Sequence, residues 1–372
     1  VCVYGCVYLY VCVCFCVCFL QAGTFCAQSP RLLRQAPIPQ FVYPFVPPAD
    51  PSATVTIKKQ PTPQVFNKRL LSANAQFTGV GFGFEDIRVQ NLLRWLRLPQ
   101  LRFPGGTVGN FYNWQNDSFY NDTYAGTRFK REIDSGFKFA FDSYAKSMVE
   151  TEATSLLMFN VIEDSPMKSA NRLRAHAPSL VGVDWIEMGN ENYDPAQGLG
   201  HVNHSGVTTA SNYITVTKQI IGALKDISPG VSVAINLHAG TWAPESWNLE
   251  FVNETYFDGC VMHPYVSVAA TIFNTFTVEQ ILKASTKMQS YFKQYQSRFE
   301  TRPLLLSEWG ILGSTHGQGT FIQSLGEASQ MLTILNTATM GGVNITQAGI
   351  HILYGGSSST PNALFFLDVD TN

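Results

Sequence analysis

Two apolar stretches of this 372-residue chain are each followed by, or end in, a glutamate. VDWIEMG (183–189) precedes Asn190 and Glu191, and RPLLLSE (302–308) ends in Glu308. Short apolar runs that stop at glycine or polar residues are typical of buried strands. Two carboxylates about 5–5.5 Å apart, one attacking the sugar and one transferring a proton, are the catalytic pair of a retaining glycosidase. The pattern predicts this chemistry if both strands end at one edge of a sheet.

Further polar and aromatic side chains lie at or just after the ends of other apolar runs. They are Glu85, Arg102, His263, Tyr265 and Trp309. An arginine beside one carboxylate keeps it ionised by lowering its pKa, while the other carboxylate stays protonated in a different environment. We expect Arg102 to do this, Tyr265 to hydrogen-bond the nucleophile, and Asn190 to hold a sugar hydroxyl beside the reacting carbon.

The elements that must position these residues alternate along the chain. The predicted strands are 78–84, 100–105, 154–162, 183–189, 231–237, 257–263, 302–308 and 348–354, and the clearest predicted helices are 86–97, 136–150, 209–227, 278–299 and 321–339. Some strands are apolar on both faces, as parallel strands covered by helices are. Eight strands over about 280 residues match a (β/α)8 TIM barrel, where chemistry sits at the carboxyl ends of the strands. A doubly wound open sheet is the alternative.

Each candidate also has a structural explanation. Glu191 fits a helix N-terminus, where acids are favoured, and Glu308 or Arg102 fits an ion pair. Their matching positions at strand ends favour catalysis for the two glutamates. Glu187 shares its side-chain direction with Glu191, and we expect it to be a buried partner of a base such as Arg102.

Three aromatic residues, Trp309, Trp114 and Tyr112, offer flat apolar faces of the kind on which sugars stack. His201 and His204 are three positions apart, which is weak support for a metal site. We predict no metal and no cofactor.

The first 66 residues differ in composition from the rest. Seven of the eight cysteines fall within the first 26 residues, in an uncharged apolar stretch. We interpret residues 1–30 as a secretory signal or a translated simple repeat. We prefer both of these interpretations to a membrane span. Residues 31–66 are rich in Pro and Gln and predict an extended linker with a short strand at 53–59. The catalytic barrel is assigned to residues 67–372.

Composition argues against several partners. Only 14% of residues are charged and the formal net charge is -2, so no long-range field would attract nucleic acid or an anionic membrane. Asn-x-Ser/Thr sequences lean slightly towards a secreted glycoprotein. They begin at Asn116, Asn121, Asn203, Asn253 and Asn344. The oligomeric state is left open.

Six segments together resemble one group of enzymes. They are EMGNE (187–191), LSEWG (306–310), LRFPGG (101–106), YNW (112–114), GFGFE (81–85) and HPY (263–265). The first two look like the acid/base and nucleophile strands of clan A retaining glycoside hydrolases. The others are similar to segments of the α-L-arabinofuranosidases of that clan, and the resemblance spans roughly residues 79–355.

The resemblance implies that Glu191 is the general acid/base and Glu308 the nucleophile. It also implies that Asn190 contacts the sugar 2-hydroxyl and that Glu85 binds the glycone. The residues implied to support the two carboxylates are Arg102, His263 and Tyr265.

Three features depart from the arabinofuranosidase pattern. Thr107 stands where that family has a sugar-contacting Asn, and Tyr354 stands where the clan usually has Trp. The chain after the barrel has no room for the family's C-terminal β-sandwich. We therefore expect a fragment, in which segment 53–59 is a strand of an incomplete sandwich.

The sequence thus predicts a retaining glycoside hydrolase that acts by double displacement on plant or algal polysaccharide or oligosaccharide and is arabinofuranosidase-like. The departures keep two alternatives open. One is a carbohydrate-binding pseudoenzyme on the same barrel, and the other is a clan member active on uronic-acid polysaccharide. The sugar, the linkage and the exo or endo mode are not determined.

Overall fold

The computed structural model describes residues 66–75, 83–119, 140–163, 165–194, 207, 209–239, 245–267, 278–312, 321–340, 342–355 and 363–366. The predicted leader, linker and strand 53–59 lie outside the described residues, as do His201 and His204.

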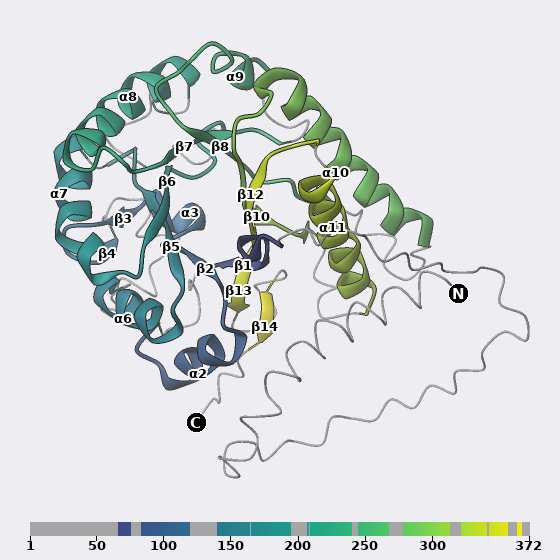
Figure 1. Ribbon diagram of the computed structural model, residues 1–372, viewed down its shortest axis with the longest axis horizontal. Helices are drawn as coiled ribbons and strands as arrows, with labels where there is room; N and C mark the ends of the chain where they lie inside the picture. Colours follow the sequence, from purple (N-terminus) through teal and green to yellow (C-terminus); the bar gives the residue numbers. More distant parts are fainter. Residues whose placement is uncertain are drawn as a thin grey trace, which may run out of the picture. The chain divides into compact units, whose positions relative to one another are not determined.

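Eight parallel strands form a closed barrel with the order β1-β12-β10-β8-β7-β6-β5-β2 (Figure 1). They are β1 (Ser72–Asn74), β2 (Gln100–Phe103), β5 (Thr154–Phe159), β6 (Val183–Met188), β7 (Val233–Leu237), β8 (Gly259–Met262), β10 (Leu304–Trp309) and β12 (Ile345–Ile350). The prediction of a (β/α)8 barrel is confirmed, and the open-sheet alternative is wrong because the sheet has no free edge.

Helices follow the strands around the outside of the barrel (Figure 1). The long ones are α2 (Ile87–Leu96), α6 (Phe141–Thr151), α7 (Pro166–His176), α8 (Ala210–Ile227), α10 (Val278–Phe299) and α11 (Phe321–Thr339). The sequence did not predict α7, although its start carries a clear signal. Ser165 accepts a hydrogen bond from the backbone N–H of Lys168, and Pro166 occupies the first helical position, where proline is favoured.

Shorter elements lie between these. They are the 3-10 helices η1 (Lys68–Leu71) and η2 (Ala177–Ser179), the helices α3 (Gly106–Gly109) and α9 (Glu245–Leu249), and the strand pairs β3 (Tyr112–Asn113) with β4 (Ser118–Phe119), β9 (Val266–Ser267) with β11 (Ile311–Leu312), and β13 (Ile352–Gly355) with β14 (Ala363–Phe366).

The first barrel strand is not where the sequence predicted it. β1 pairs with β12 at Ser72 and with β2 at Asn74, whereas residues 83 and 84 of the predicted strand 78–84 are not in a strand. Glu85 is exposed and precedes Asp86, which caps α2. The prediction failed because the sequence of β1, SAN, is too short and polar to appear as an apolar run.

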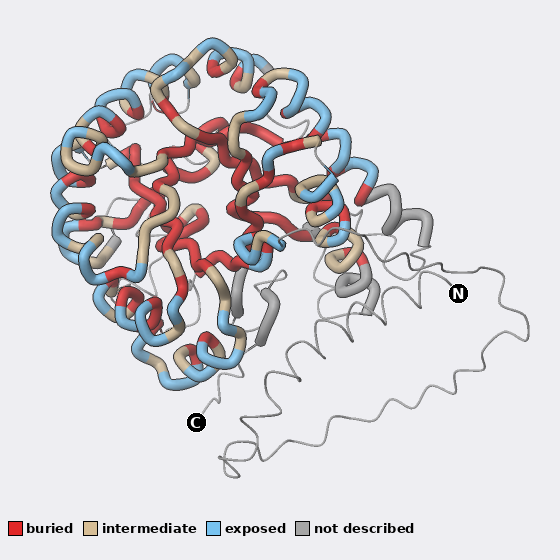
Figure 2. Tube along the Cα trace, in the orientation of Figure 1, coloured by how far each residue is buried: buried red, intermediate tan, exposed pale blue. Residues whose placement is uncertain are grey.

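The strands of the barrel consist mainly of buried residues (Figure 2). One face packs against the helices, and the other holds a small apolar cluster of Leu156, Ala234, Val261 and Leu305. The strand register pairs Leu156 with Arg102 and Ala234 with Glu187. Since paired residues point to the same side of a sheet, Arg102 and Glu187 share the inner face with this cluster.

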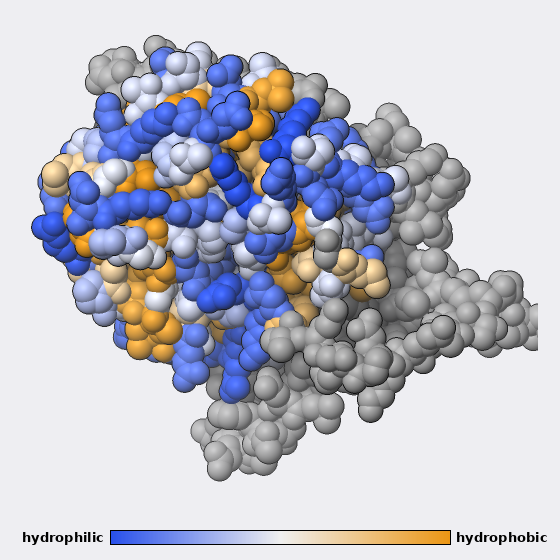
Figure 3. Space-filling view, turned by 45° about the horizontal axis from the view of Figure 1, so that its top comes forward, coloured by the Kyte–Doolittle hydropathy of each residue, from blue (hydrophilic) through white to orange (hydrophobic). Residues whose placement is uncertain are grey.

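The molecular face seen in Figure 3 is mainly hydrophilic, with smaller hydrophobic areas between the polar groups. Among the helices that the structure describes, none combines the length and the apolar character needed to cross a membrane.

Candidate active site

A cluster of ionisable side chains occupies the carboxyl end of the barrel. Its members are Arg102, Glu187, Glu191, His263, Tyr265, Glu308 and His351. One carboxylate oxygen of Glu191, one of Glu308 and one ring nitrogen of His263 all lie within 4.8 Å of one another. Two glutamates from distant parts of the chain therefore face each other across one small gap.

Glu308, at the end of β10, is almost fully buried and surrounded by donors. Arg102 Nη1 and Asn74 Nδ2 donate to its Oε1, the latter at 3.2 Å, and the Tyr265 hydroxyl donates to its Oε2 at 2.5 Å. Burial by itself raises the pKa of Glu308. The charges of His263 and Arg102 outweigh that effect and lower the pKa to about 2. Glu308 is therefore an ionised carboxylate.

Glu191 follows β6 and has different neighbours. Its Oε1 lies 2.9 Å from His263 Nδ1 and accepts a hydrogen bond from the Tyr193 hydroxyl at 3.3 Å. Its side chain is 13% exposed, whereas that of Glu308 is 4% exposed. The two carboxylates thus have the unlike environments that a pair with different tasks requires.

The turn that presents Glu191 is held by buried amides. The φ of Glu191 is +47° and that of Gly189 is +74°, a left-handed conformation that costs a non-glycine residue about 1–2 kcal/mol. The Asn110 side chain exchanges two hydrogen bonds with the backbone of Asn190, at 2.8 and 3.0 Å. Asn236 donates to the carbonyls of Met188 and Gly189. These contacts maintain a conformation that the local sequence would not adopt by itself.

Arg102 connects the two sides of the cluster. Its guanidinium forms a fork with Glu187, with N–O distances of 2.7 and 2.8 Å, and also donates to Glu308 and to Asn190 Oδ1. Arg102 and Glu187 are almost completely buried. The expectation that Glu187 is a buried partner of Arg102 is confirmed.

A hydrogen-bond chain joins Glu191 to this fork. His263 Nε2 lies 2.9 Å from Ser307 Oγ, and the Ser307 hydroxyl donates to Glu187 Oε1 at 3.2 Å. Since Ser307 has one proton and gives it to Glu187, its oxygen accepts from His263 Nε2–H. Burial lowers the pKa of His263, but the charge of Glu308 and the hydrogen bond to Glu191 raise it more, so that the net shift is upward.

Two residues of the site were missed in the sequence. Asn74 ends β1, which was predicted elsewhere. His351 follows β12, with its Nε2 3.6 Å from Glu308 Oε2 and its ring edge-on to Tyr265 at 5.3 Å. Burial lowers the pKa of His351 more than Glu308 raises it. The available signal was its position as the first ionisable residue after a barrel strand. The side chain of Tyr354, which stands where the clan usually has Trp, lies outside the described part of the structure.

The Pro-Gly-Gly sequence after β2 has a steric explanation. Gly105 has a φ of +68°, and a Cβ placed on it would lie 1.7 Å from Asn74 Oδ1. Only glycine therefore lets the loop pass over Asn74 while Asn74 contacts Glu308.

Several predicted substrate contacts are placed differently. Tyr112, Trp114 and Trp309 are at most 2% exposed, so none of them presents an open ring face in this structure, and the role of Trp309 in binding substrate stays a prediction. Tyr112 and Trp114 pack edge-on against Phe103 instead, at 5.5 and 5.7 Å. Glu85 does not end a barrel strand, and its role in binding the glycone stays a prediction.

Glu191, His263 and Glu308 are also close enough to surround a metal ion. However, the Arg102 guanidinium contacts Glu308, and the raised pKa of His263 favours its charged form. Two positive charges of the protein, on Arg102 and on charged His263, therefore already lie against these carboxylates and repel a cation in the same gap. We assign no metal to these residues.

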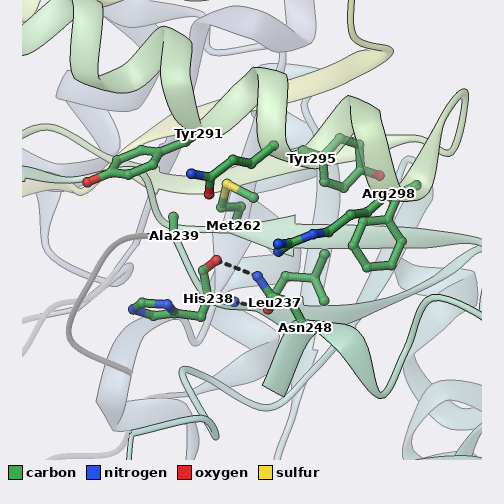
Figure 4. Close-up of a pocket in the computed structure, with 10 residues that line it drawn as sticks. Leu237, His238, Ala239, Asn248, Met262, Tyr291, Tyr295 and Arg298 are labelled. Atoms are coloured by element: carbon green, nitrogen blue, oxygen red, sulfur yellow. Dashed lines mark hydrogen bonds between the residues drawn. The ribbon is translucent and has the colours of Figure 1, made fainter. Parts of the chain in front are cut away.

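A small cavity lies beside the site, between the ends of β7 and β8 and helix α10 (Figure 4). Its volume of about 10 Å³ is room for about one water molecule, so it is not a substrate pocket. Asn248 holds the backbone of His238 there through hydrogen bonds of 2.8 and 2.9 Å (Figure 4). The His238 ring packs against Tyr193, the residue that donates to Glu191.

Comparisons with known proteins identify relatives of the fold. No protein-family model and no curated protein matches the sequence. The structure is similar to that of the GH51 arabinofuranosidase from Xanthomonas axonopodis pv. citri, with a TM-score of 0.59 and 14% identity, covering 81% of this chain and 69% of that one. For a family 51 α-L-arabinofuranosidase from Bifidobacterium longum, the TM-score is 0.56 and the identity 16%, covering 77% of this chain and 68% of that one. For the GH51 α-L-arabinofuranosidase from Thermotoga petrophila RKU-1, the TM-score is 0.57 and the identity 14%, covering 82% of this chain and 67% of that one. At these identities the similarity establishes the barrel fold.

Proposed function

We propose that this protein is a retaining glycoside hydrolase that cleaves plant or algal polysaccharide or oligosaccharide. The observation that carries the proposal is the approach of Glu191 and Glu308 to within 4.8 Å, measured between carboxylate oxygens. Retaining glycosidases hold their carboxyl groups about 5–5.5 Å apart, whereas inverting ones leave about 6.5–9.5 Å for a water molecule. The short separation supports covalent catalysis over direct attack by water.

Glu308 is the nucleophile in this proposal. Its lowered pKa keeps it ionised, and contacts from Arg102, Asn74 and Tyr265 hold it in one orientation. Glu308 attacks the anomeric carbon and forms a glycosyl ester as the bond to the leaving oxygen breaks. Tyr265 and Asn74 are positioned to orient the attacking carboxylate.

Glu191 is the general acid/base. Its neighbour His263 can accept a hydrogen bond from protonated Glu191 or donate one to ionised Glu191. Because His263 Nε2 donates to Ser307, Nδ1 either accepts a hydrogen bond from protonated Glu191 or, when His263 is charged, donates one to ionised Glu191. Glu191 gives its proton to the leaving oxygen in the first step. In the second step it takes a proton from the water that attacks the ester, which releases the sugar with retained configuration and restores Glu308.

The substrate proposal is arabinofuranosidase-like, because the solved structures with a similar barrel are described as arabinofuranosidases. We also propose secretion, on the basis of residues 1–30. N-terminal sequencing of the protein recovered from the medium of expressing eukaryotic cells would test this, since an uncleaved, cell-retained chain would contradict it.

Nitrophenyl glycosides in a panel that includes α-L-arabinofuranoside and β-glucuronide test the reaction. We expect Glu308→Gly to lose nearly all activity and to regain it with azide, giving a glycosyl azide of inverted configuration. We expect Glu191→Ala to give a retained glycosyl azide and to lose less activity on dinitrophenyl glycosides, whose leaving groups need little protonation. Saccharide binding without release from any glycoside by the wild type would replace the enzyme proposal with the pseudoenzyme.

A further inference from the structure

Strand β10 presents two neighbouring side chains, Ser307 and Glu308, to the barrel mouth. Leu305 belongs to the inner apolar cluster, and side chains alternate along a strand, so Ser307 points inward and Glu308 would regularly point outward. The register with β12 shifts between Leu306 and Trp309, where β10 has one residue more than its partner. An extra residue of this kind is a β-bulge, which re-aims a side chain. The bulge thus places a buried hydroxyl directly beside the proposed nucleophile.

The Ser307 hydroxyl has a fixed direction. It lies 2.9 Å from His263 Nε2 and donates to Glu187 Oε1 at 3.2 Å, and all three side chains are almost completely buried. The Arg102 fork holds Glu187 as a carboxylate, and a carboxylate can only accept hydrogen bonds. Ser307 therefore gives its one proton to Glu187 and has none for His263, so the ring nitrogen Nε2 has to keep its own proton.

The other ring nitrogen of His263 faces both catalytic carboxylates. Nδ1 lies 2.9 Å from Glu191 Oε1 and 3.8 Å from Glu308 Oε2. If Nδ1 lost its proton, its lone pair would face the charged oxygen of Glu308, and also that of Glu191 whenever Glu191 is ionised. Since Nε2 cannot lose its proton without opposing the lone pairs of Ser307, the favoured ring is the imidazolium, with a proton on each nitrogen.

The charges around His263 agree with this form. The titratable and charged groups that face it are Arg102, Glu187, Glu191, Tyr265, Glu308 and His351. Burial lowers the pKa of His263, and the charge of Arg102 lowers it further. The charge of Glu308 and the hydrogen bond with Glu191 raise it more, so the net shift is upward. His351 opposes the cation little, because burial lowers its own pKa and favours the neutral ring.

We propose that Ser307 is a positioning residue that, together with Glu187, keeps the Nδ1–H of His263 directed at both catalytic glutamates throughout the reaction. The inference rests on the proposed function and deepens it. When Glu308 forms the glycosyl ester and Glu191 gives its proton to the leaving oxygen, the negative charge passes from Glu308 to Glu191, and the second step returns it. One imidazolium thus faces the charged carboxylate in both steps, without having to gain or lose a proton.

The contacts of Glu191 fit this arrangement. His263 and Tyr193 both meet its Oε1. When the ring is charged, Oε1 accepts from both of them, so the proton that Glu191 transfers is carried by Oε2. The buried chain from Glu187 through Ser307 to His263 therefore orients the acid/base without taking its proton.

Titration of His263 in the absence of substrate tests the proposal independently of turnover. The chain has seven histidines, so magnetic resonance of protein labelled in the histidine rings follows each of them, and His263→Asn identifies the signal. Ser307→Ala should move the titration of His263 to lower pH by about one pH unit, the order expected for the loss of one hydrogen bond to a charged group. Nε2 should be the nitrogen that loses its proton in this variant.

Two serine variants control for the change of side chain. Ser307→Thr keeps the hydroxyl, and His263 should titrate in it as in the wild type. Ser169→Ala is the matched control, because the buried Ser169 hydroxyl has no hydrogen-bond partner among the described residues, and it should change nothing.

Glutamine variants test whether one ring serves both carboxylates. Glu308→Gln and Glu191→Gln each remove one negative partner of Nδ1, so each should move the titration of His263 to lower pH. Glu150→Gln is the matched control, because the carboxylate of Glu150 binds Arg94 on the outside of the barrel, and His263 should titrate in it as in the wild type.

Two results would overturn the proposal: a titration of His263 in Ser307→Ala equal to that in Ser169→Ala, or a titration in either catalytic glutamine variant equal to that in Glu150→Gln. Wild-type hydrolysis of the glycoside panel is measured separately. Hydrolysis together with either of these results removes this inference alone. The expected titrations without hydrolysis remove the proposed enzyme function and keep the role of Ser307 in holding His263.

Discussion

Glu191 and Glu308 have identical side chains, and only their neighbours distinguish them. Glu308 accepts from the guanidinium of Arg102, an amide and a phenol, all of which favour the ionised form. Glu191 contacts His263, an imidazole that donates or accepts according to its own protonation. The different roles proposed for the two glutamates therefore rest on their contacts and not on the residue type.

Glu308 should make the folded state sensitive to acid over a defined range. Its pKa is lowered from 4.5 in the unfolded chain to about 2 in the folded protein, so its contribution to the free energy of unfolding is complete above pH 4.5 and is lost as the pH falls towards 2. Urea unfolding at several pH values in this range measures the slope of the free energy of unfolding against pH. We expect Glu308→Gln to have a shallower slope, and an unchanged slope would show that Glu308 is not the group responsible.

His351 should set the acid limb of the pH–rate profile together with Glu308. Protonated His351 lowers the pKa of Glu308 through its charge, so His351→Asn should raise that pKa and move the acid limb of kcat/KM upward by roughly half a pH unit. His176→Asn is the control, because His176 lies beside Asp142 on another part of the barrel. Coincident acid limbs for wild type and His351→Asn would refute this role.

Arg102 should be far more important for stability than an arginine on the surface. Its removal leaves the buried carboxylates of Glu187 and Glu308 without their cation, and breaking a buried pair costs about 3–5 kcal/mol. We expect Arg102→Met to lower the free energy of unfolding by that amount. Arg94→Met, which breaks an exposed pair with Glu150, should cost about 1 kcal/mol or less. Chemical denaturation of both variants measures the contrast.

At the scale of elements, the site depends on how each strand ends. The strands aim side chains into the barrel mouth, but the turns after β2 and β6 adopt left-handed backbone at Gly105, Gly189 and Glu191. Buried asparagines hold the second of these turns. The geometry of the cluster is therefore a property of strand–turn units, which need Gly105 and Gly189 as well as the ionisable side chains.

Gly105→Ala tests this dependence. The new Cβ would overlap Asn74 Oδ1, so Asn74 has to leave Glu308 or the loop has to move. We expect kcat to fall by at least about tenfold and the free energy of unfolding to fall by roughly 1–3 kcal/mol. Gly222→Ala is the control, because Gly222 lies in α8 with nothing near its Cβ position; it should stabilise the protein by about 0.5–1 kcal/mol. Full activity in Gly105→Ala would contradict the steric argument.

For the whole molecule, closure of the barrel depends on its shortest strand. β1 has three residues and pairs with both β12 and β2. Without it, those two strands would have free edges, which are sites for aggregation. The residues from Ser72 to Asn74 thus connect the first and last parts of the barrel sequence.

Truncation tests both the closure and the assignment of the barrel to residues 67–372. We expect a chain that begins at residue 66 to unfold in one cooperative thermal transition close to that of the full chain. A chain that begins at residue 76 lacks β1 and should aggregate or lose its cooperative transition. Circular dichroism and light scattering measure both outcomes. Equal stability of the two truncated chains would show that β1 does not close the barrel.

The sequence alone was sufficient to predict the barrel, seven of its strands and most of the residues of the cluster. This worked because parallel strands buried on both faces are apolar runs, and a polar residue at the end of such a run has to lie at the barrel mouth. Glu191, Glu308, Arg102, His263 and Tyr265 were all found in this way.

Only the tertiary structure decided the rest. Asn74 joins the site at the end of β1, which is too short to show a pattern. His351 joins it at the break between β12 and β13. Tyr112 and Trp114 are of the residue types that stack on sugars, yet packing against Phe103 buries them. Periodicity reports which side of an element is apolar, whereas contacts between distant segments determine what covers a side chain and which charges surround a carboxylate.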